Sequence, residues 1–235
     1  MVRFALLLAA FLAACAPAPQ APPPRSAPVT LPADLPPPEV AAENFVAVVR
    51  RVEPVAEAIC RETAPARNCD IRIVVDARRG LPPNAFHTIA EDGTPLVIFT
   101  ISLIAEARNQ DELAFIMGHE AAHYILGHIA RAEARAAEGA LMAGILGEIT
   151  GADIATVRRM QRLAAEIRAR SYSKAFELEA DALGARIALA AGYDPIRGAE
   201  YFNRIPDPGN RLLATHPPNA ARIEVVRRAV AAAAG

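Results

Sequence analysis

The stretch "GHEAAHYILGH" at residues 118–128 contains three of the chain's five histidines and one glutamate. His119 and His123 are four residues apart, so on a helix they project from one face about one turn apart. Two imidazoles at this spacing can reach a single metal ion. Glu120, rotated by about 100° on the helix, lies beside such an ion, where its carboxylate can accept a proton from water. The stretch therefore predicts a helix that carries two metal ligands and a general base.

A third ligand has to come from another part of the chain. Neutral imidazole suits Zn(II), and a catalytic zinc keeps three protein ligands and one position for water. The segment "FELEADALG" at 176–184 supplies carboxylates on a second predicted helix. Glu177 and Asp181 share a face at i, i+4, whereas Glu179 lies about 200° away from Glu177 and faces outward. We therefore expect Glu177 to complete a site for one zinc ion and Asp181 to accept the other N–H of His119.

His128 ends the opening stretch and has a different orientation. On a helix that continues through the stretch, it points roughly 140–180° away from the face of His119 and His123. We expect His128 to be a structural or surface residue and not a ligand. The flanking segments "DELAFIM" and "YILGH" have apolar residues at helical spacing, which predicts a buried helix.

The same motifs occur within a longer set that spans most of the chain after residue 84. The set consists of "NAF" at 84–86, "ELAFIMGHEAAHYILGH" at 112–128, "ELEADALG" at 177–184, "AGYDP" at 191–195 and "THPPNAARI" at 215–223. This set resembles the HtpX-like and CAAX-prenyl-protease-like family of HExxH zinc metallopeptidases, which are gluzincins. The resemblance implies a zincin-type fold and hydrolysis of peptide bonds, and it points to the periplasmic branch without transmembrane helices.

The resemblance also implies a place for the substrate. In gluzincins an edge strand pairs with the extended backbone of the substrate, and "NAF" resembles that strand. Asn84 and Ala85 are therefore expected to contact the substrate. The alternative is that Asn84, which follows two prolines, only closes a turn. No role follows for His87.

Two residues near the C-terminus gain a role from the family. His216 precedes two prolines at the start of the last predicted helix. The resemblance places it near the zinc, where it would stabilise the oxyanion, with Arg222 as a supporting cation. His216 could instead cap the helix, or fill the open zinc position and keep the enzyme latent. For Arg222 the alternative is a surface salt bridge.

The N-terminus has the pattern of a bacterial lipoprotein. Arg3 precedes the apolar run "ALLLAAFLAA" at 5–14, and "LAAC" occupies 12–15. We expect a signal peptide at 1–14, cleavage before Cys15 and diacylation of its thiol, with an ordinary secretory signal as the alternative. Ala16 resembles the type sorted to the outer membrane. Residues 16–38 contain ten of the 20 prolines, so 15–38 form a lipidated tether and the metallopeptidase domain covers 39–235.

Two cysteines remain for the folded domain. Cys60 and Cys69 are nine positions apart, and in an oxidising periplasm they can form a disulfide. Two buried free thiols are the alternative. A metal site is disfavoured because no C-x-x-C spacing is present.

The periodicity of apolar residues predicts an α+β fold that is mostly helical, with a small sheet of about three strands. The predicted strands are 70–76, 84–90 and 95–101, the last two forming a hairpin. The predicted helices are 39–63, 102–108, 110–138, 140–147, 152–170, 174–191, 195–204 and 218–233.

The sequence thus predicts a zinc-dependent endopeptidase that is anchored to the outer membrane by Cys15 and faces the periplasm. Its expected partners are protein or peptide substrates, above all misfolded envelope proteins in protein quality control. The net charge of −1 offers no basic surface for nucleic acid. The alternative is a latent or chaperone-like zinc-binding module that holds unfolded envelope proteins. An open metal position distinguishes the enzyme, since structural zinc is closed by four protein ligands.

Overall fold

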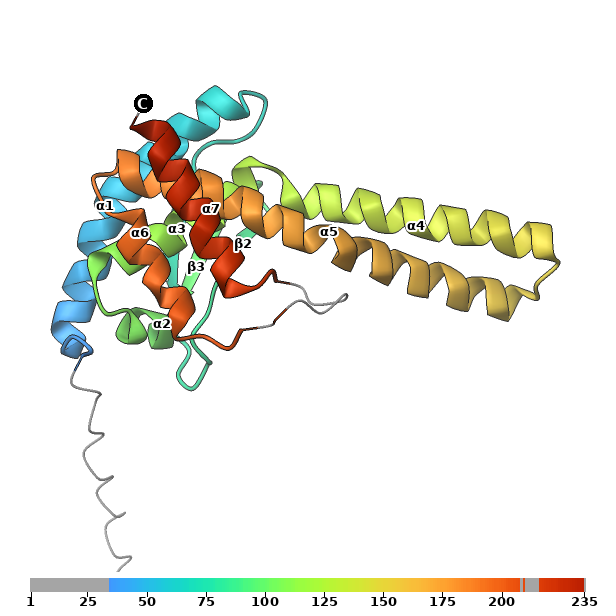
Figure 1. The fold of residues 1–235 in the computed structure, drawn as a ribbon, viewed down its shortest axis with the longest axis horizontal. Coiled ribbons are helices and arrows are strands. Elements are labelled where there is room, and N and C mark those ends of the chain that lie inside the picture. Colours follow the sequence, from blue (N-terminus) through green and yellow to red (C-terminus); the bar gives the residue numbers. More distant parts are fainter. Residues whose placement is uncertain (1–33, 208, 210–215, 235) are drawn as a thin grey trace, which may run out of the picture. The chain divides into compact units, whose positions relative to one another are not determined.

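The computed structural model describes residues 34–207, 209 and 216–234. The predicted signal peptide, Cys15 and most of the predicted tether lie outside the described residues. The elements in chain order are α1 (Pro38–Thr63), β1 (Arg72–Asp76), β2 (Ala85–Ile89), β3 (Pro95–Thr100), α2 (Ile101–Glu106), α3 (Gln110–Ile125), α4 (His128–Thr150), α5 (Ile154–Ala190), α6 (Pro195–Gly198), the 3-10 helix η1 (Ala199–Asn203) and α7 (Asn219–Ala233) (Figure 1).

The three strands form one mixed sheet in the order β1-β3-β2. β1 runs parallel to β3, and β2 pairs with β3 as an antiparallel hairpin. Gly93 in the connecting turn has a φ of +84°, a conformation that glycine adopts without steric cost. The prediction of an α+β fold with a small three-stranded sheet is confirmed. Because β2 pairs only with β3 among the described strands, one edge of β2 faces away from the sheet.

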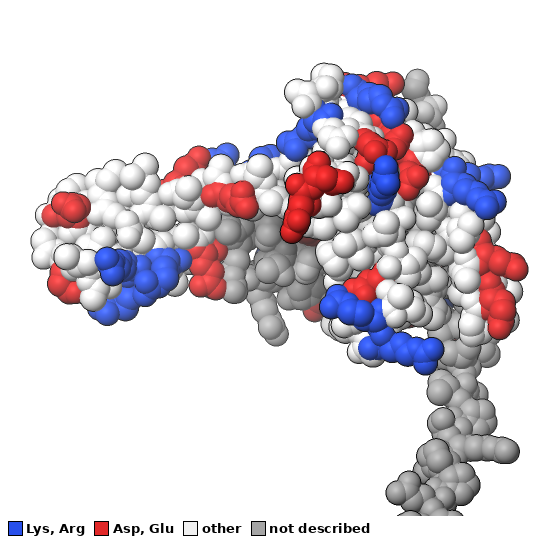
Figure 2. Space-filling model, turned by 180° about the vertical axis from the view of Figure 1, so that it is seen from behind, with Lys and Arg blue, Asp and Glu red and all other residues white. Residues whose placement is uncertain are grey.

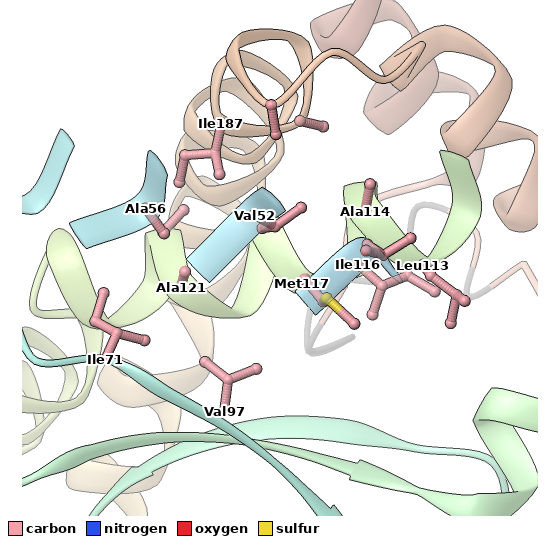
Figure 3. Close-up of a cluster of buried hydrophobic side chains, with 14 of the residues drawn as sticks. Val52, Ala56, Ile71, Val97, Leu113, Ala114, Ile116, Met117, Ala121 and Ile187 are labelled. Carbon is pink, nitrogen blue, oxygen red and sulfur yellow. The ribbon is translucent and has the colours of Figure 1, made fainter. Parts of the chain in front are cut away.

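Helix α3, which carries the HExxH stretch, lies at the centre of the core. Thirteen of its 16 residues are buried. It packs against α1, α5 and the sheet, and Figure 3 shows side chains of these elements in contact around it. The labelled side chains include Val52 and Ala56 of α1, Ile71 and Val97 near the sheet, Met117 and Ala121 of α3 and Ile187 of α5. Since burial of each large apolar side chain contributes about 1.5–3 kcal/mol, α3 is held rigidly on all sides.

Helices α3 and α5 cross at backbone contact distance. A Cβ atom added to Gly118 would lie 2.6 Å from the carbonyl oxygen of Gly184, and one added to Gly184 would lie 2.6 Å from the backbone nitrogen of His119. Two facing glycines are therefore required at this crossing. The crossing brings the "ELEAD" segment of α5 beside the histidines of α3.

The helix boundaries differ from the sequence prediction in three main places, one of which is the predicted break at residue 139, where α4 continues from His128 to Thr150. The predicted helix 110–138 is wrong, because α3 ends at Ile125 and α4 begins at His128. Gly127 separates them with a φ of +68°, the left-handed conformation that ends a helix. The predicted break near residues 171–173 is also wrong. There α5 continues from Ile154 to Ala190, because packing against α4 and α3 outweighs the weak helix preference of serine.

Helices α4 and α5 form a hairpin arm that extends from the rest of the described domain (Figure 1). Helices α4 and α5 pack closely at Gly139 and Gly147, where a side chain larger than hydrogen would overlap α5. Large apolar residues lie on the surface of the arm, much of which is uncharged in Figure 2. They include Leu141, Met142, Ile145, Leu146, Ile149, Ile154 and Leu163. Among the described residues, no helix is long and apolar enough to cross a membrane.

Cys60 and Cys69 are joined by a disulfide, with their Cα atoms 5.7 Å apart. The bond ties the end of α1 to the segment that leads into β1. Closing this loop restricts the unfolded chain and typically contributes about 2–4 kcal/mol.

We expect Gly118→Ala to lower the free energy of unfolding by about 1–3 kcal/mol, because the added methyl group overlaps the backbone of Gly184. The melting temperature should fall by roughly 2–4 °C per kcal/mol, which calorimetry measures. Gly144→Ala on α4 is the control, since its methyl group would meet only the flexible amide end of Gln161. A Gly118→Ala protein as stable as the Gly144→Ala protein would contradict the close crossing.

Candidate metal centre

Two histidines of α3 and one glutamate of α5 converge on a common point. The Nε2 atoms of His119 and His123 are 3.0 Å apart. Oε1 of Glu177 lies 3.3 Å from Nε2 of His123, and Oε2 lies 3.6 Å from Nε2 of His119. Among the described residues, these three side chains form the group of His, Cys, Asp and Glu whose ligand atoms could hold a metal ion. Ligand atoms at about 2.0–2.1 Å from a tetrahedral zinc are spaced in this way, so the donor set fits zinc.

The far nitrogen of His119 is fixed by a buried ion pair. Nδ1 of His119 lies 2.9 Å from Oδ1 of Asp181, a carboxylate that is completely buried. An ionised carboxylate only accepts hydrogen bonds, so Nδ1 carries the hydrogen and Nε2 presents its lone pair to the metal position. Arg222 donates two hydrogen bonds to the same carboxylate, at 2.8 Å and 2.7 Å. The alternative that Arg222 forms a surface salt bridge is wrong, because α7 places it inside the domain.

His128 fixes the other histidine, which the sequence analysis did not expect. It is 4% exposed, and its Nδ1 lies 2.8 Å from Nδ1 of His123, while its Nε2 lies 3.2 Å from Oε2 of Glu179. If Nε2 of His128 donates to Glu179, its Nδ1 accepts from His123, and Nε2 of His123 keeps its lone pair for a metal. The surface position considered for His128 is wrong because the helix does not continue: the turn at Gly127 folds His128 back onto His123.

The electrostatics of the cluster favour ionised carboxylates, and they shift the pKa values of its histidines in different directions. Burial would raise the pKa of the Glu177 carboxyl, but its contacts with His123 and His216 and the positive charge of Arg222 lower it far below its usual range. Burial lowers the pKa of His123. For His128, burial and repulsion from His123 together lower the pKa to about 4. For His119 burial lowers the pKa, but the hydrogen bond to Asp181 and the negative charge of Asp181 together raise it above its ordinary value. A neutral imidazole with a free lone pair is the form of histidine that binds metal.

The cluster opens into a cavity of about 480 Å³. The cavity is bounded by β2 on one side and by α3 and α5 on the other, and Glu120 lines it directly beside His119 and His123. His87 of β2 also lines the cavity, and its Nδ1 lies 3.4 Å from Oε2 of Glu120. No local sequence pattern indicates this contact, because it joins a strand to a helix across 33 positions.

Asn84 and Ala85 lie at the entrance to β2 and line the same cavity. The backbone of Asn84 is engaged with Thr100, since its carbonyl accepts the Thr100 N–H at 3.0 Å and its N–H donates to Thr100 Oγ1 at 3.0 Å. Asn84 therefore extends the pairing of β2 with β3 by one residue at the open end of the hairpin, and it also lines the cavity. Both readings of "NAF" are compatible with this position.

His216 lies at the rim of the cavity, about half exposed, with its Nδ1 3.1 Å from Oε2 of Glu177. It does not act as a helix cap. Helix α7 begins at Asn219 after Pro218, and no side-chain cap bond is present there. His216 therefore contacts the predicted metal ligand and leaves two of its three proposed roles open.

The chain matches the family model of peptidase family M48 over residues 47–230. The chain belongs to peptidase family M48. It is similar to the mitochondrial metalloendopeptidase OMA1 of Arabidopsis thaliana, with 26% identity over 138 residues. The match covers 57% of this chain and 27% of that relative, so the chain spans about a quarter of the relative's length. By family, this chain is therefore a metallopeptidase. The region that the family model matches contains His119, His123 and Glu177.

We expect His128→Phe to weaken zinc binding by about 10- to 100-fold, because the ring loses the hydrogen bond that orients His123. Phenylalanine retains the stacking on Phe176, whose ring lies 4.6 Å from that of His128, so the melting temperature should change little. Competition with a chromophoric chelator measures the affinity. An unchanged affinity would show that His128 has a packing role only.

Proposed function

We propose that this M48 peptidase is a zinc-dependent endopeptidase of the bacterial envelope that cuts misfolded envelope proteins. The observation that supports the proposal most strongly is the convergence of His119, His123 and Glu177 within an open cavity beside Glu120. Three protein donors leave room for a water molecule and a substrate oxygen, as catalytic zinc sites do. A structural zinc site would be closed by a fourth donor.

The proposed mechanism assigns each step of proton transfer to a residue. Zinc held by His119, His123 and Glu177 would acidify a water molecule and polarise the peptide carbonyl. Glu120 accepts a proton from that water while the oxygen of the water forms a bond to the carbonyl carbon. Glu120 then passes the proton to the leaving nitrogen, so that one water is consumed and a new carboxyl and a new amino end result. His216, at the rim, donates a hydrogen bond to the oxygen that gains negative charge.

The shape of the cavity favours an extended, unfolded substrate. The free edge of β2 offers backbone groups to which a polypeptide can add as a further strand, starting at Ala85, while Asn84, whose backbone pairs with Thr100, lines the cavity beside it. Apolar side chains line the rest of the cavity, among them Phe86, Phe115 and Phe202. Folded proteins do not present extended apolar segments, so this recognition would select misfolded chains.

The proposed location rests on the N-terminal sequence. A diacylated Cys15 would hold the chain on the periplasmic side of the outer membrane. The proline-rich composition of the segment before α1 would favour a long tether between the lipid and the folded domain. Such a tether would let the peptidase act on envelope proteins that fail to assemble near the membrane.

A second candidate is a latent or chaperone-like module. It is favoured by the contact of His216 with Glu177 at 3.1 Å, which brings a further imidazole to the metal cluster. If His216 supplied a fourth donor, the cavity would bind unfolded chains through β2 with little hydrolysis.

We expect Glu120→Gln to retain one zinc per chain and to lower the cleavage rate by at least about 100-fold, because the amide cannot accept the proton. Hydrolysis of fluorescently labelled casein, an unfolded protein, and elemental analysis measure the two quantities. Glu133→Gln on α4 is the matched control, since Glu133 does not line the cavity. A Glu120→Gln protein with the wild-type rate would exclude Glu120 as the base.

The proposed substrate class and location are tested in cells. Producing the Glu120→Gln protein in place of the wild type should cause full-length, misfolded envelope proteins to accumulate in the membrane fraction. Proteomic comparison of cleavage products measures this. A set of lost products confined to the cytoplasm would contradict the proposal.

Replacement of His216 distinguishes the two candidates. If His216 stabilises the oxyanion, His216→Ala should lower kcat by about 100-fold or more, the effect of losing one oxyanion donor. If His216 blocks the metal position, the same change should raise the rate. Steady-state hydrolysis of labelled casein decides between them, and the zinc content should stay at one per chain.

A further inference from the structure

His87 contacts the catalytic side of the cluster from the strand that faces it. Its imidazole projects from β2 towards α3, and its Nδ1 lies 3.4 Å from Oε2 of Glu120. The ring stacks on His123, with centroids 5.3 Å apart and planes 8° apart. Both the His87 and Glu120 side chains are largely buried, at 13% and 14% exposure. His87 is not part of the group whose atoms could ligate the metal.

The direction of this hydrogen bond follows from its partners. Glu120 has to be ionised to act as a base, and a carboxylate only accepts hydrogen bonds. Nδ1 of His87 therefore carries the hydrogen, and Nε2 has the lone pair. A distance of 3.4 Å is long, but hydrogen bonds of catalytic groups often tighten when the substrate binds.

Packing alone does not account for a histidine at position 87. Its Nε2 is buried and has no hydrogen-bond partner in the part of the chain that the structure describes. Such a buried polar atom disfavours folding, and phenylalanine or leucine would fill the same space without it. The contact with Glu120 is the one hydrogen bond that the ring makes with the described residues. The imidazole thus lies beside the proposed base at a cost to stability.

We propose that His87 is a positioning residue for the general base: its Nδ1–H holds Oε2 of Glu120 and leaves Oε1 directed at the attacking water. This inference rests on the proposed function of Glu120. Without that bond the glutamate could rotate away from the cluster. Because β2 is also the strand proposed to bind the substrate backbone, His87 ties the base to the element that sets the position of the scissile bond.

The test compares two substitutions of His87. In His87→Phe the ring keeps its volume and its stacking on His123 but loses the donor. In His87→Asn the side-chain amide nitrogen occupies about the position of Nδ1 and restores the donor. We expect His87→Phe to lower kcat on labelled casein by about 10- to 100-fold, the effect of a small misplacement of a catalytic group, with KM nearly unchanged. His87→Asn should recover most of that loss.

Zinc content and the melting temperature distinguish positioning from a structural role. In His87→Phe the zinc content should match the wild type, and the melting temperature should equal or exceed it, because the unpartnered buried nitrogen is removed. Val75→Ala on β1 is the control, because Val75 is 43% exposed, does not line the cavity and lies outside the proposed substrate-binding strand. Loss of zinc in His87→Phe in parallel with activity, or equal kcat losses in the Phe and Asn variants, would overturn the proposal.

A second measurement does not depend on hydrolysis. Nitrogen-15 NMR of the zinc-loaded protein with labelled histidine reports which ring nitrogen carries the hydrogen, and the signal missing in His87→Phe assigns the residue. We expect a hydrogen on Nδ1 of His87, and a ring with its hydrogen on Nε2 alone would overturn the proposal. If Glu120→Gln is inactive but His87→Phe keeps the wild-type kcat, the proposed function stands and the role of His87 falls. If Glu120→Gln is fully active, the proposed function itself fails.

Discussion

The close crossing of α3 and α5 is the constraint on which the rest of the site depends. The paired glycines at positions 118 and 184 let the two backbones touch. Asp181, one turn before Gly184 on α5, contacts His119. Glu177, one turn further back, contacts both histidines. A wider crossing would leave the carboxylate of Glu177 out of reach, since its side chain cannot extend by a further methyl diameter. The position of the ligands is therefore set by backbone packing in the core and not by the flexible side chains themselves.

The crossing also buries several charges, and their mutual pairing makes this tolerable. Asp181 is fully buried, but it receives two hydrogen bonds from Arg222 and one from His119. The guanidinium of Arg222 in turn lies over the ring of Phe202 at 3.9 Å. Buried ion pairs of this kind add little net stability, but the loss of one partner leaves the other uncompensated. The network thus makes the orientation of His119 a property of the whole fold.

The local sequence determined the elements whose signals are short-ranged. The HExxH spacing, the i, i+4 pair of Glu177 and Asp181 and the alternation in the three strands all depend on the period of a single helix or strand. The structure places Glu177 and Asp181 on the inner face of α5, with Glu179 partly exposed as expected. Even the left-handed turn has a local cause in Gly127, although its consequence for His128 was not foreseen because the apolar pattern continues through it.

The contacts between different elements depend on the tertiary structure alone. His87 meets Glu120 over 33 positions and His128 meets Glu179 over 51, and neither spacing has a period that a sequence pattern could contain. The amino-acid sequence is sufficient to predict one helix with two histidines and the general base Glu120, and a second helix with acidic residues on one face. Packing decided which nitrogen of each imidazole faces the metal position, because that choice depends on the buried partner of the opposite nitrogen.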